Sequence, residues 1–122
     1  HPRMRRQLLM ECAAGQGTEL GRTWDEMRHL FEGLDYGRVG LCLDTQHLFA
    51  SGMSDLQTHE SIVRLFDEAE SICPNKIQLF HLNDSQKAFG SRVDRHAIRL
   101  REGFIWAESD EGLKTLFERC FE

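Results

Sequence analysis

In the segment Gly40-Leu41-Cys42-Leu43-Asp44-Thr45-Gln46-His47, a short apolar run passes directly into an aspartate and a histidine. An apolar run without polar alternation is typical of a strand that is covered on both faces of a parallel sheet. Two further runs of this kind lie before and after it, at residues 7–12 and 77–82. We therefore predict three parallel strands, at 7–12, 39–44 and 77–82.

Helical patterns follow each predicted strand. A capping-box sequence begins at Thr23 and leads into an apolar face that stops at Gly33. A second apolar face covers residues 62–73 and ends before Pro74, and a third follows Ser109. Strand–helix units of this size form parallel sheets with right-handed crossovers. The sequence therefore predicts an α/β fold with about three βα units, as in part of a (β/α)8 TIM barrel.

The length limits how much of such a barrel is present. A complete barrel takes roughly 250 residues, whereas this chain has 122 residues. We expect residues 1–122 to form one domain that is a fragment of a barrel, with the rest of the barrel as its partner.

The composition fits a soluble globular domain, with 40% hydrophobic and 29% charged residues and a formal net charge of −5. No apolar run approaches the roughly 20 residues that cross a bilayer, and no secretory leader is visible. We therefore expect an intracellular protein, in the cytoplasm or the nucleus, with no membrane partner. The net negative charge argues mildly against nucleic acid, but bound divalent ions would reverse the charge near a metal site.

The four cysteines show no C-x-x-C spacing and lie among apolar residues. This pattern indicates buried free thiols in a reducing compartment rather than a disulfide framework. They are Cys12, Cys42, Cys73 and Cys120.

Each predicted strand ends at, or next to, a residue that binds metals: Glu11, Asp44 and His81. The carboxyl ends of parallel strands meet at one edge of a sheet, so these side chains should converge in space. A lone acid at a strand end is more often a helix cap or a solvated group. Three such residues in register favour a functional site.

Three further residues extend this set. His47 follows Asp44 where the strand gives way to a turn. In Asp94-Arg95-His96, extended backbone would send the acid and the imidazole to one side and Arg95 to the other. Three carboxylates and three histidines without cysteine suit Zn²⁺ or Mn²⁺.

Simple structural roles are the better interpretation for the remaining histidines and for the helix aromatics. We expect His29 and His59 to be surface residues. The aromatic residues expected in helix cores are Trp24, Phe31, Phe66 and Phe117.

Four motifs follow one another along the chain: ECAAGQG at 11–17, GLCLDTQH at 40–47, HLNDS at 81–85 and GSRVDRH at 90–96. Together they resemble the endonuclease IV family of apurinic/apyrimidinic (AP) endonucleases, also called AP endonuclease family 2. Residues 102–106 resemble viral members of the family more than bacterial ones, which would add the virion to the expected locations.

The resemblance implies a xylose-isomerase-like barrel that holds three zinc ions, of which this chain supplies strands five to seven in the C-terminal half. Glu11 would be catalytic and would bridge two of the metals, and Asp44 and His81 would hold one of those two. The third ion would be held by His47, Asp94 and His96. The family's other ligands lie on strands that these residues do not include, so the fragment alone should be inactive.

The activity implied is that of a zinc-dependent AP endonuclease in base excision repair. The complete protein, expected to be a monomer, would cut duplex DNA 5′ of an abasic site and leave a 3′-hydroxyl. Arg92 and Arg95, with Arg99 and Arg101 behind them, would contact backbone phosphates without reading sequence.

Two departures from the family pattern stand near the expected ligands. The segment between His96 and Leu100 is one residue longer than usual, and Arg101 replaces a glycine. Gln46 occupies a position where a smaller residue or cysteine is common, and we expect it to alter the surroundings of the metal ligands.

Two alternatives remain at this point. A metal-dependent sugar isomerase or epimerase of the same barrel class would share Glu11, Asp44 and His81, but would not need His47 or Asp94-Arg95-His96. An inactive DNA-binding remnant would keep the third-metal residues without the catalytic pair of ions.

Overall fold

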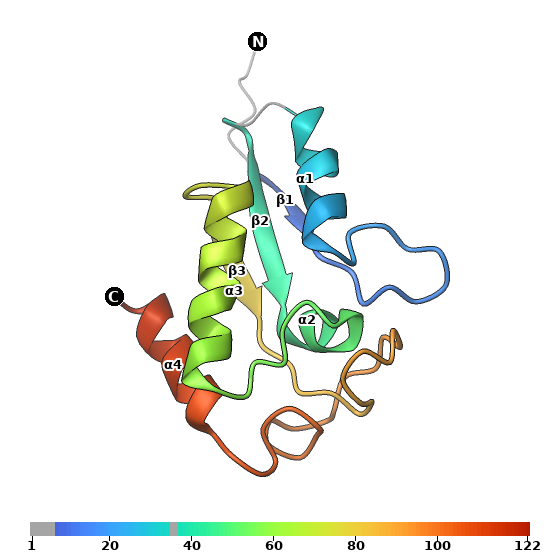
Figure 1. The fold of residues 1–122 in the computed structure, drawn as a ribbon, viewed down its shortest axis with the longest axis vertical. Helices are drawn as coiled ribbons and strands as arrows, with labels where there is room; N and C mark the ends of the chain where they lie inside the picture. Colours follow the sequence, from blue (N-terminus) through green and yellow to red (C-terminus); the bar gives the residue numbers. More distant parts are fainter. Residues whose placement is uncertain (1–6, 35–36) are drawn as a thin grey trace.

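A parallel sheet forms the centre of the fold in the computed structural model, which describes residues 7–34 and 37–122. Within these residues the strands are β1 (Leu8–Glu11), β2 (Val39–Asp44) and β3 (Ile77–His81), in the order β1-β2-β3. Glu11 pairs with Cys42, and Asp44 pairs with His81, so all three strands end at the same edge (Figure 1). The three predicted strands and their parallel arrangement are confirmed.

Burial differs between the central strand and its neighbours. Every residue of β2 is buried, whereas β1 and β3 contain exposed positions such as Leu8 and Leu79. The prediction that all three strands are covered on both faces is therefore wrong for β1 and β3. The physical reason is that each of them is an edge strand in the described sheet, with a neighbouring strand on one side only.

The first helix, α1 (Trp24–Glu32), begins where the sequence predicts it. The Thr23 hydroxyl accepts a hydrogen bond from the Glu26 backbone amide at 3.1 Å. The Glu26 carboxylate instead accepts from the amides of Gly21 and Arg22. Only half of the predicted capping box therefore forms, because the preceding turn supplies other donors for Glu26.

Helix α3 (His59–Ile72) lies beside α1, and both pack on one face of the sheet (Figure 1). Thr58 and Ser61 form a complete capping box at its start, and Cys73 ends it before Pro74. The core between helices and sheet is apolar and closely packed. Its central members are Met27, Phe31, Leu41, Leu43, Ile62, Leu65 and Ala69.

The short helix α2 (Thr45–Ser51) follows β2 without a connecting loop. The prediction of a turn at His47 is wrong, since His47 lies in the first turn of this helix. Asp44 caps the helix by accepting from the amides of Gln46 and His47 at 2.9 Å and 3.2 Å. One carboxylate thus ends the strand and starts the helix.

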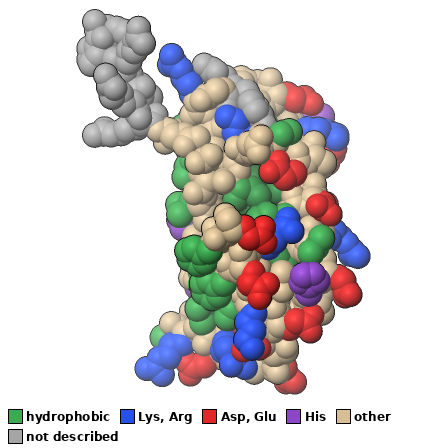
Figure 2. All heavy atoms as spheres, turned by 90° about the vertical axis from the view of Figure 1, so that its left-hand side faces the viewer, with side chains coloured by type: hydrophobic (Ala, Val, Ile, Leu, Met, Phe, Trp, Pro, Cys, Tyr) green, Lys and Arg blue, Asp and Glu red, His purple; other side chains and the backbone are tan. Residues whose placement is uncertain are grey.

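Helix α4 (Glu111–Cys120) packs on α3 through its first turns. Gly112 lies against the Leu56 backbone, and the buried Trp106 indole donates to the Leu56 carbonyl at 2.9 Å. Its last turns are more exposed, with Phe117 44% exposed and Cys120 exposed, so the predicted burial of these two residues is wrong. Cys120 lines a groove together with residues of β3, and hydrophobic side chains reach the surface on this side of the molecule (Figure 2).

The other three cysteines are buried, and all four are free thiols, as predicted. Among the described residues, no helix has both the length and the apolar character needed to cross a membrane.

Candidate metal centre

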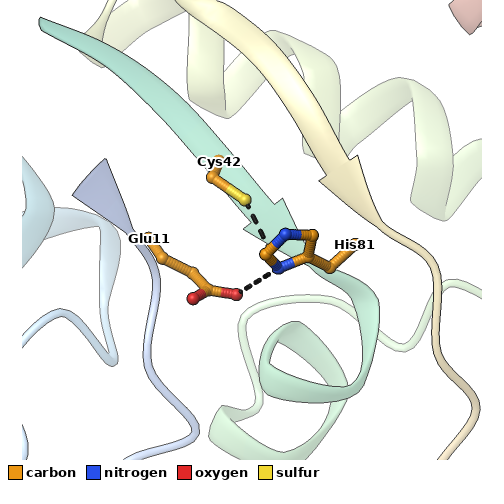
Figure 3. A group of neighbouring side chains, drawn as sticks. All are labelled: Glu11, Cys42 and His81. Atoms are coloured by element: carbon orange, nitrogen blue, oxygen red, sulfur yellow. Dashed lines mark hydrogen bonds and ion pairs between the residues drawn. The ribbon is translucent and has the colours of Figure 1, made fainter. Parts of the chain in front are cut away.

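Three side chains meet where the strands end: Glu11 on β1, Cys42 on β2 and His81 on β3 (Figure 3). A Glu11 carboxylate oxygen lies 2.8 Å from His81 Nδ1, and Cys42 Sγ lies 3.7 Å from the same nitrogen. We call these three residues the strand-end cluster. The convergence of Glu11 with His81 that the sequence predicts is present in the structure.

Cys42 is a ligand candidate that the sequence reasoning missed. The signal was available, because side chains alternate along a strand and Cys42 therefore shares a face with Asp44, two residues later. Burial raises the pKa of the Cys42 thiol to about 11, with Glu11 and Asp44 adding to the shift. Without a metal, the thiol is therefore protonated at neutral pH.

A second group combines a strand end, a helix and a loop. His47 Nε2 lies 3.2 Å from Asp94 Oδ1, and His96 Nε2 lies 3.5 Å from the same oxygen. Asp44 Oδ2 lies 3.5 Å from His96 Nε2 and 3.9 Å from His47 Nε2. We call Asp44, His47, Asp94 and His96 the four-residue cluster. The predicted approach of Asp94 and His96, two residues apart, is present in the structure.

Asp44 lies between the two clusters. Its side chain is 2% exposed, and Oδ2 accepts from Asn83 Nδ2 at 3.2 Å while lying 4.0 Å from His81 Nδ1. The resemblance assigns Asp44 to an ion shared with His81, whereas the distances also bring it to His47 and His96. A single buried carboxylate therefore connects both candidate sites.

The orientation of His47 fits metal binding. Its Nδ1 lies 2.8 Å from the Cys12 carbonyl oxygen, which only accepts hydrogen bonds, so Nδ1 carries the proton and donates it. Nε2 then presents its lone pair toward Asp94 and Asp44. A histidine fixed through its other nitrogen in this way is the usual arrangement of a metal ligand. The donor atoms of Asp44, His47 and His96 lie within 4.8 Å of one another, and this set fits a divalent ion such as Zn²⁺. Asp94 offers a further carboxylate beside the two imidazoles.

The pKa of His47 in the metal-free chain is raised from its ordinary value. Burial lowers this pKa, but Asp44, the Cys12 carbonyl and Asp94 together raise it by more. The surroundings thus favour positive charge at this position, and a bound cation would supply it.

Arg92 joins two loops that carry candidate ligands. Its guanidinium donates to the carbonyl oxygens of Gly15 at 2.9 Å and Gly17 at 3.3 Å, and its own φ is +59°. The Asp94 amide donates to Gln16 Oε1 at 3.0 Å, which strengthens the same connection. Arg92 therefore holds the loop after β1 against the loop after β3. Arg95 is exposed beside the cluster, and the DNA contacts of both arginines stay predictions.

The segment after His96 follows a defined path, set by Asp84, which the sequence analysis did not single out. The buried Asp84 carboxylate accepts from the backbone amides of Ser85, Arg101 and Ile105 at 2.8 to 2.9 Å. The end of the segment after His96 is therefore held by hydrogen bonds to Asp84.

The remaining histidines of the described chain lie away from both clusters, as predicted. His29 is exposed on α1 between Asp25 and Glu32. His59 is exposed at the start of α3, with Nδ1 3.2 Å from Thr115 Oγ1 on α4.

Comparison with known proteins identifies the family of the chain. Residues 3–116 match the xylose isomerase-like TIM barrel family, and the chain belongs to it. The resemblance to endonuclease IV is also confirmed. A probable endonuclease 4 of Chloroflexus aurantiacus is 43% identical over 104 residues, which cover 84% of this chain and 36% of the relative. A probable endonuclease 4 of Clostridium beijerinckii is 36% identical over 94% of this chain and 40% of its own length.

Two solved structures agree with these sequence matches. The crystal structure of endonuclease IV from Thermus thermophilus superposes with a TM-score of 0.76 and 34% identity, over 95% of this chain and 39% of that one. The AsfvAP:AG crystal structure gives a TM-score of 0.74 and 27% identity, over 98% and 43%. The chain thus spans about two fifths of these proteins, as a partial barrel. The viral likeness of residues 102–106 stays a prediction.

Proposed function

We propose that this chain supplies part of the metal centre of a zinc-dependent AP endonuclease, which acts in base excision repair on duplex DNA that contains abasic sites. The observation that carries the proposal is the four-residue cluster. It brings together side chains from β2, α2 and the loop after β3, with the imidazoles of His47 and His96 each within 3.9 Å of both carboxylates.

The chain's residues have distinct roles in this proposal. Asp44, His47, Asp94 and His96 would hold one ion. Glu11, Asp44 and His81 would contribute to two further ions, together with ligands from the rest of the barrel. Bound divalent ions would activate a water molecule and neutralise charge on the phosphate and the leaving oxygen.

Other groups would orient the reactants. The Cys12 carbonyl keeps His47 in the tautomer that leaves Nε2 free. Glu11, half-exposed at the open end of the sheet, would accept the proton of the attacking water as its oxygen bonds to phosphorus. The bond from phosphorus to the 3′-oxygen on the 5′ side of the lesion would break, and that oxygen would leave as a hydroxyl after taking a proton from solvent. The exposed Arg95 would contact a backbone phosphate, and Arg92 would do so while it keeps the two loops together.

The sugar isomerase alternative does not account for the four-residue cluster. One or two ions held by strand-end residues suffice for an isomerase, and His47, Asp94 and His96 would then have no reason to converge. Their convergence favours the nuclease. The inactive DNA-binding remnant is distinguished from it by measuring incision.

The test uses the complete barrel protein to which this chain corresponds and a duplex that contains one abasic-site analogue. We expect incision immediately 5′ of the analogue, its loss on chelation, and its recovery when Zn²⁺ is returned. His47→Ala should abolish incision, whereas the matched control His29→Ala, on the exposed face of α1, should leave it unchanged. A folded, zinc-loaded protein that does not cut the analogue would refute the proposal.

A further inference from the structure

Gln46 lies at the start of α2, between the cap residue Asp44 and the ligand candidate His47, and its side chain is fully buried. Its amide nitrogen donates to Ser85 Oγ at 3.1 Å and to the Val93 carbonyl at 3.0 Å. Both acceptors belong to the loop after β3. One buried amide thus joins the helix to two separate points of that loop.

Those two points lie next to the loop's ligand candidates. Val93 directly precedes Asp94, and Ser85 pairs with His96 in an isolated antiparallel bridge. The Ser85 hydroxyl in turn donates to the Lys87 carbonyl at 2.7 Å, so this hydroxyl both accepts from Gln46 and donates within the loop. A shift of either point would move Asp94 or His96 relative to His47.

The amide has one available orientation. Its two hydrogens are both used, while Gln46 Oε1 is buried without a hydrogen-bond partner among the described residues. A flipped amide would turn Oε1 toward the Val93 carbonyl, and two acceptors repel each other. The side chain therefore keeps its two donations although its oxygen stays unsatisfied, which is costly in a buried position.

The two halves of the four-residue cluster differ in how firmly they are held. Asp44 and His47 lie on a strand end and a helix, with side chains 2% and 13% exposed. Asp94 and His96 lie on the loop, with side chains 38% and 39% exposed. If ion binding had to order this loop, the loss of conformational entropy in the loop would weaken the binding of the ion.

We propose that Gln46 is a positioning residue for the metal centre: it holds Asp94 and His96 at ligand distance from Asp44 and His47 without contacting the ion itself. This inference rests on the proposed function, because it assumes that the four-residue cluster binds a metal. The Asp94 amide is also held by Gln16, so the loss of Gln46 weakens the site rather than destroying it.

The test measures Zn²⁺ affinity of the complete barrel protein to which this chain corresponds, by competition with a chromophoric chelator. Asp94→Ala first identifies the binding step that belongs to the four-residue cluster. Gln46→Met keeps the length of the side chain but removes both donations, and we expect about 10- to 100-fold weaker binding at that step. Gln57→Met is the matched control, since Gln57 is exposed and donates to the Phe104 carbonyl. It should bind Zn²⁺ like the unaltered chain.

Two further readouts separate positioning from simple destabilisation. Substituted Co²⁺ should show an altered visible spectrum in Gln46→Met, because the ligand geometry changes, but an unaltered one in Gln57→Met. Ser85→Ala removes one of the two acceptors, so we expect a smaller loss of affinity that is not additive with Gln46→Met. Ser85→Ala also decides the question if Gln46→Met does not fold.

The outcomes distinguish the two proposals. If the unaltered chain binds Zn²⁺ at the Asp94-dependent step and both Gln46→Met and Ser85→Ala bind it equally well, the positioning role is wrong and the metal centre stands. If the unaltered chain shows no Asp94-dependent step, the metal centre fails, and the role of Gln46 fails with it.

Discussion

Replacing Asp44 by asparagine should separate metal binding from folding. The carboxylate accepts from Gln46 and His47 with Oδ1 and from Asn83 with Oδ2. Asparagine is an N-cap of about equal quality, so its single acceptor oxygen can keep both cap bonds. The amide group then faces Asn83 as a second donor, and one hydrogen bond is lost. We therefore expect the metal-free chain to lose only about 1 kcal/mol of unfolding free energy.

The effect on zinc should be much larger. Asp44 Oδ2 lies within 4.0 Å of three histidine nitrogens, those of His47, His81 and His96. The introduced asparagine would offer an uncharged amide there in place of an anionic ligand. Changes to groups that only support a ligand already cost about 10- to 100-fold in metal affinity. We expect more than about 100-fold for the ligand itself, which corresponds to about 2.7 kcal/mol.

The assay pairs urea unfolding of the metal-free chain with zinc competition on the same samples. Asp44→Ala is the comparison, because it also removes the cap and should cost about 1 to 2 kcal/mol more in stability. If Asp44→Asn binds zinc as tightly as the unaltered chain, Asp44 is a helix cap alone and its assignment as a ligand of the four-residue cluster is wrong.

Two further predictions concern packing and pH. In Gly112→Ala, the added Cβ would overlap the Leu56 carbonyl, so we expect thermal melting to show a loss of about 3 kcal/mol in unfolding free energy. The control Gly33→Ala, whose added Cβ meets no atom within 4 Å, should lose about 0.5 kcal/mol or less. Equal losses would contradict the close packing of α4. In the metal-free chain the pKa of His47 is raised, so protonated His47 stabilises the fold below its unfolded pKa of about 6.5, and this contribution is lost as the pH rises through the folded pKa. His47→Gln should remove that pH dependence from unfolding curves, and an unchanged dependence would show that other groups cause it.

Much of the fold could be predicted because periodicity is local information. The apolar runs at β1, β2 and β3 and the apolar faces of α1 and α3 identify these elements from a few neighbouring residues each. Strand parallelism then follows from the helical connections, and the meeting of Glu11 with His81 follows from parallelism.

The errors have two physical causes. Helix α2 is only seven residues long and starts directly after the last residue of a strand pattern, so its periodicity is too short to read. The exposure of Phe117 and Cys120 depends on which elements cover the end of α4, which periodicity does not report.

The supports of the candidate site were also beyond sequence reasoning. Gln46 contacts residues 39 and 47 positions away, and Arg92 contacts Gly15 from 77 positions away. These long-range hydrogen bonds depend on the paths of the loops, which local sequence patterns do not report. Most candidate ligands could be identified from the sequence, whereas the groups that hold them in place could not.

A zinc-edge anomalous diffraction experiment on crystals of the zinc-loaded chain determines whether the four-residue cluster is a metal centre. We expect an anomalous peak between Asp44, His47, Asp94 and His96, with ligand atoms at about 2.0 to 2.2 Å. A fully loaded crystal with no peak at these four residues would show that the cluster is not a metal centre.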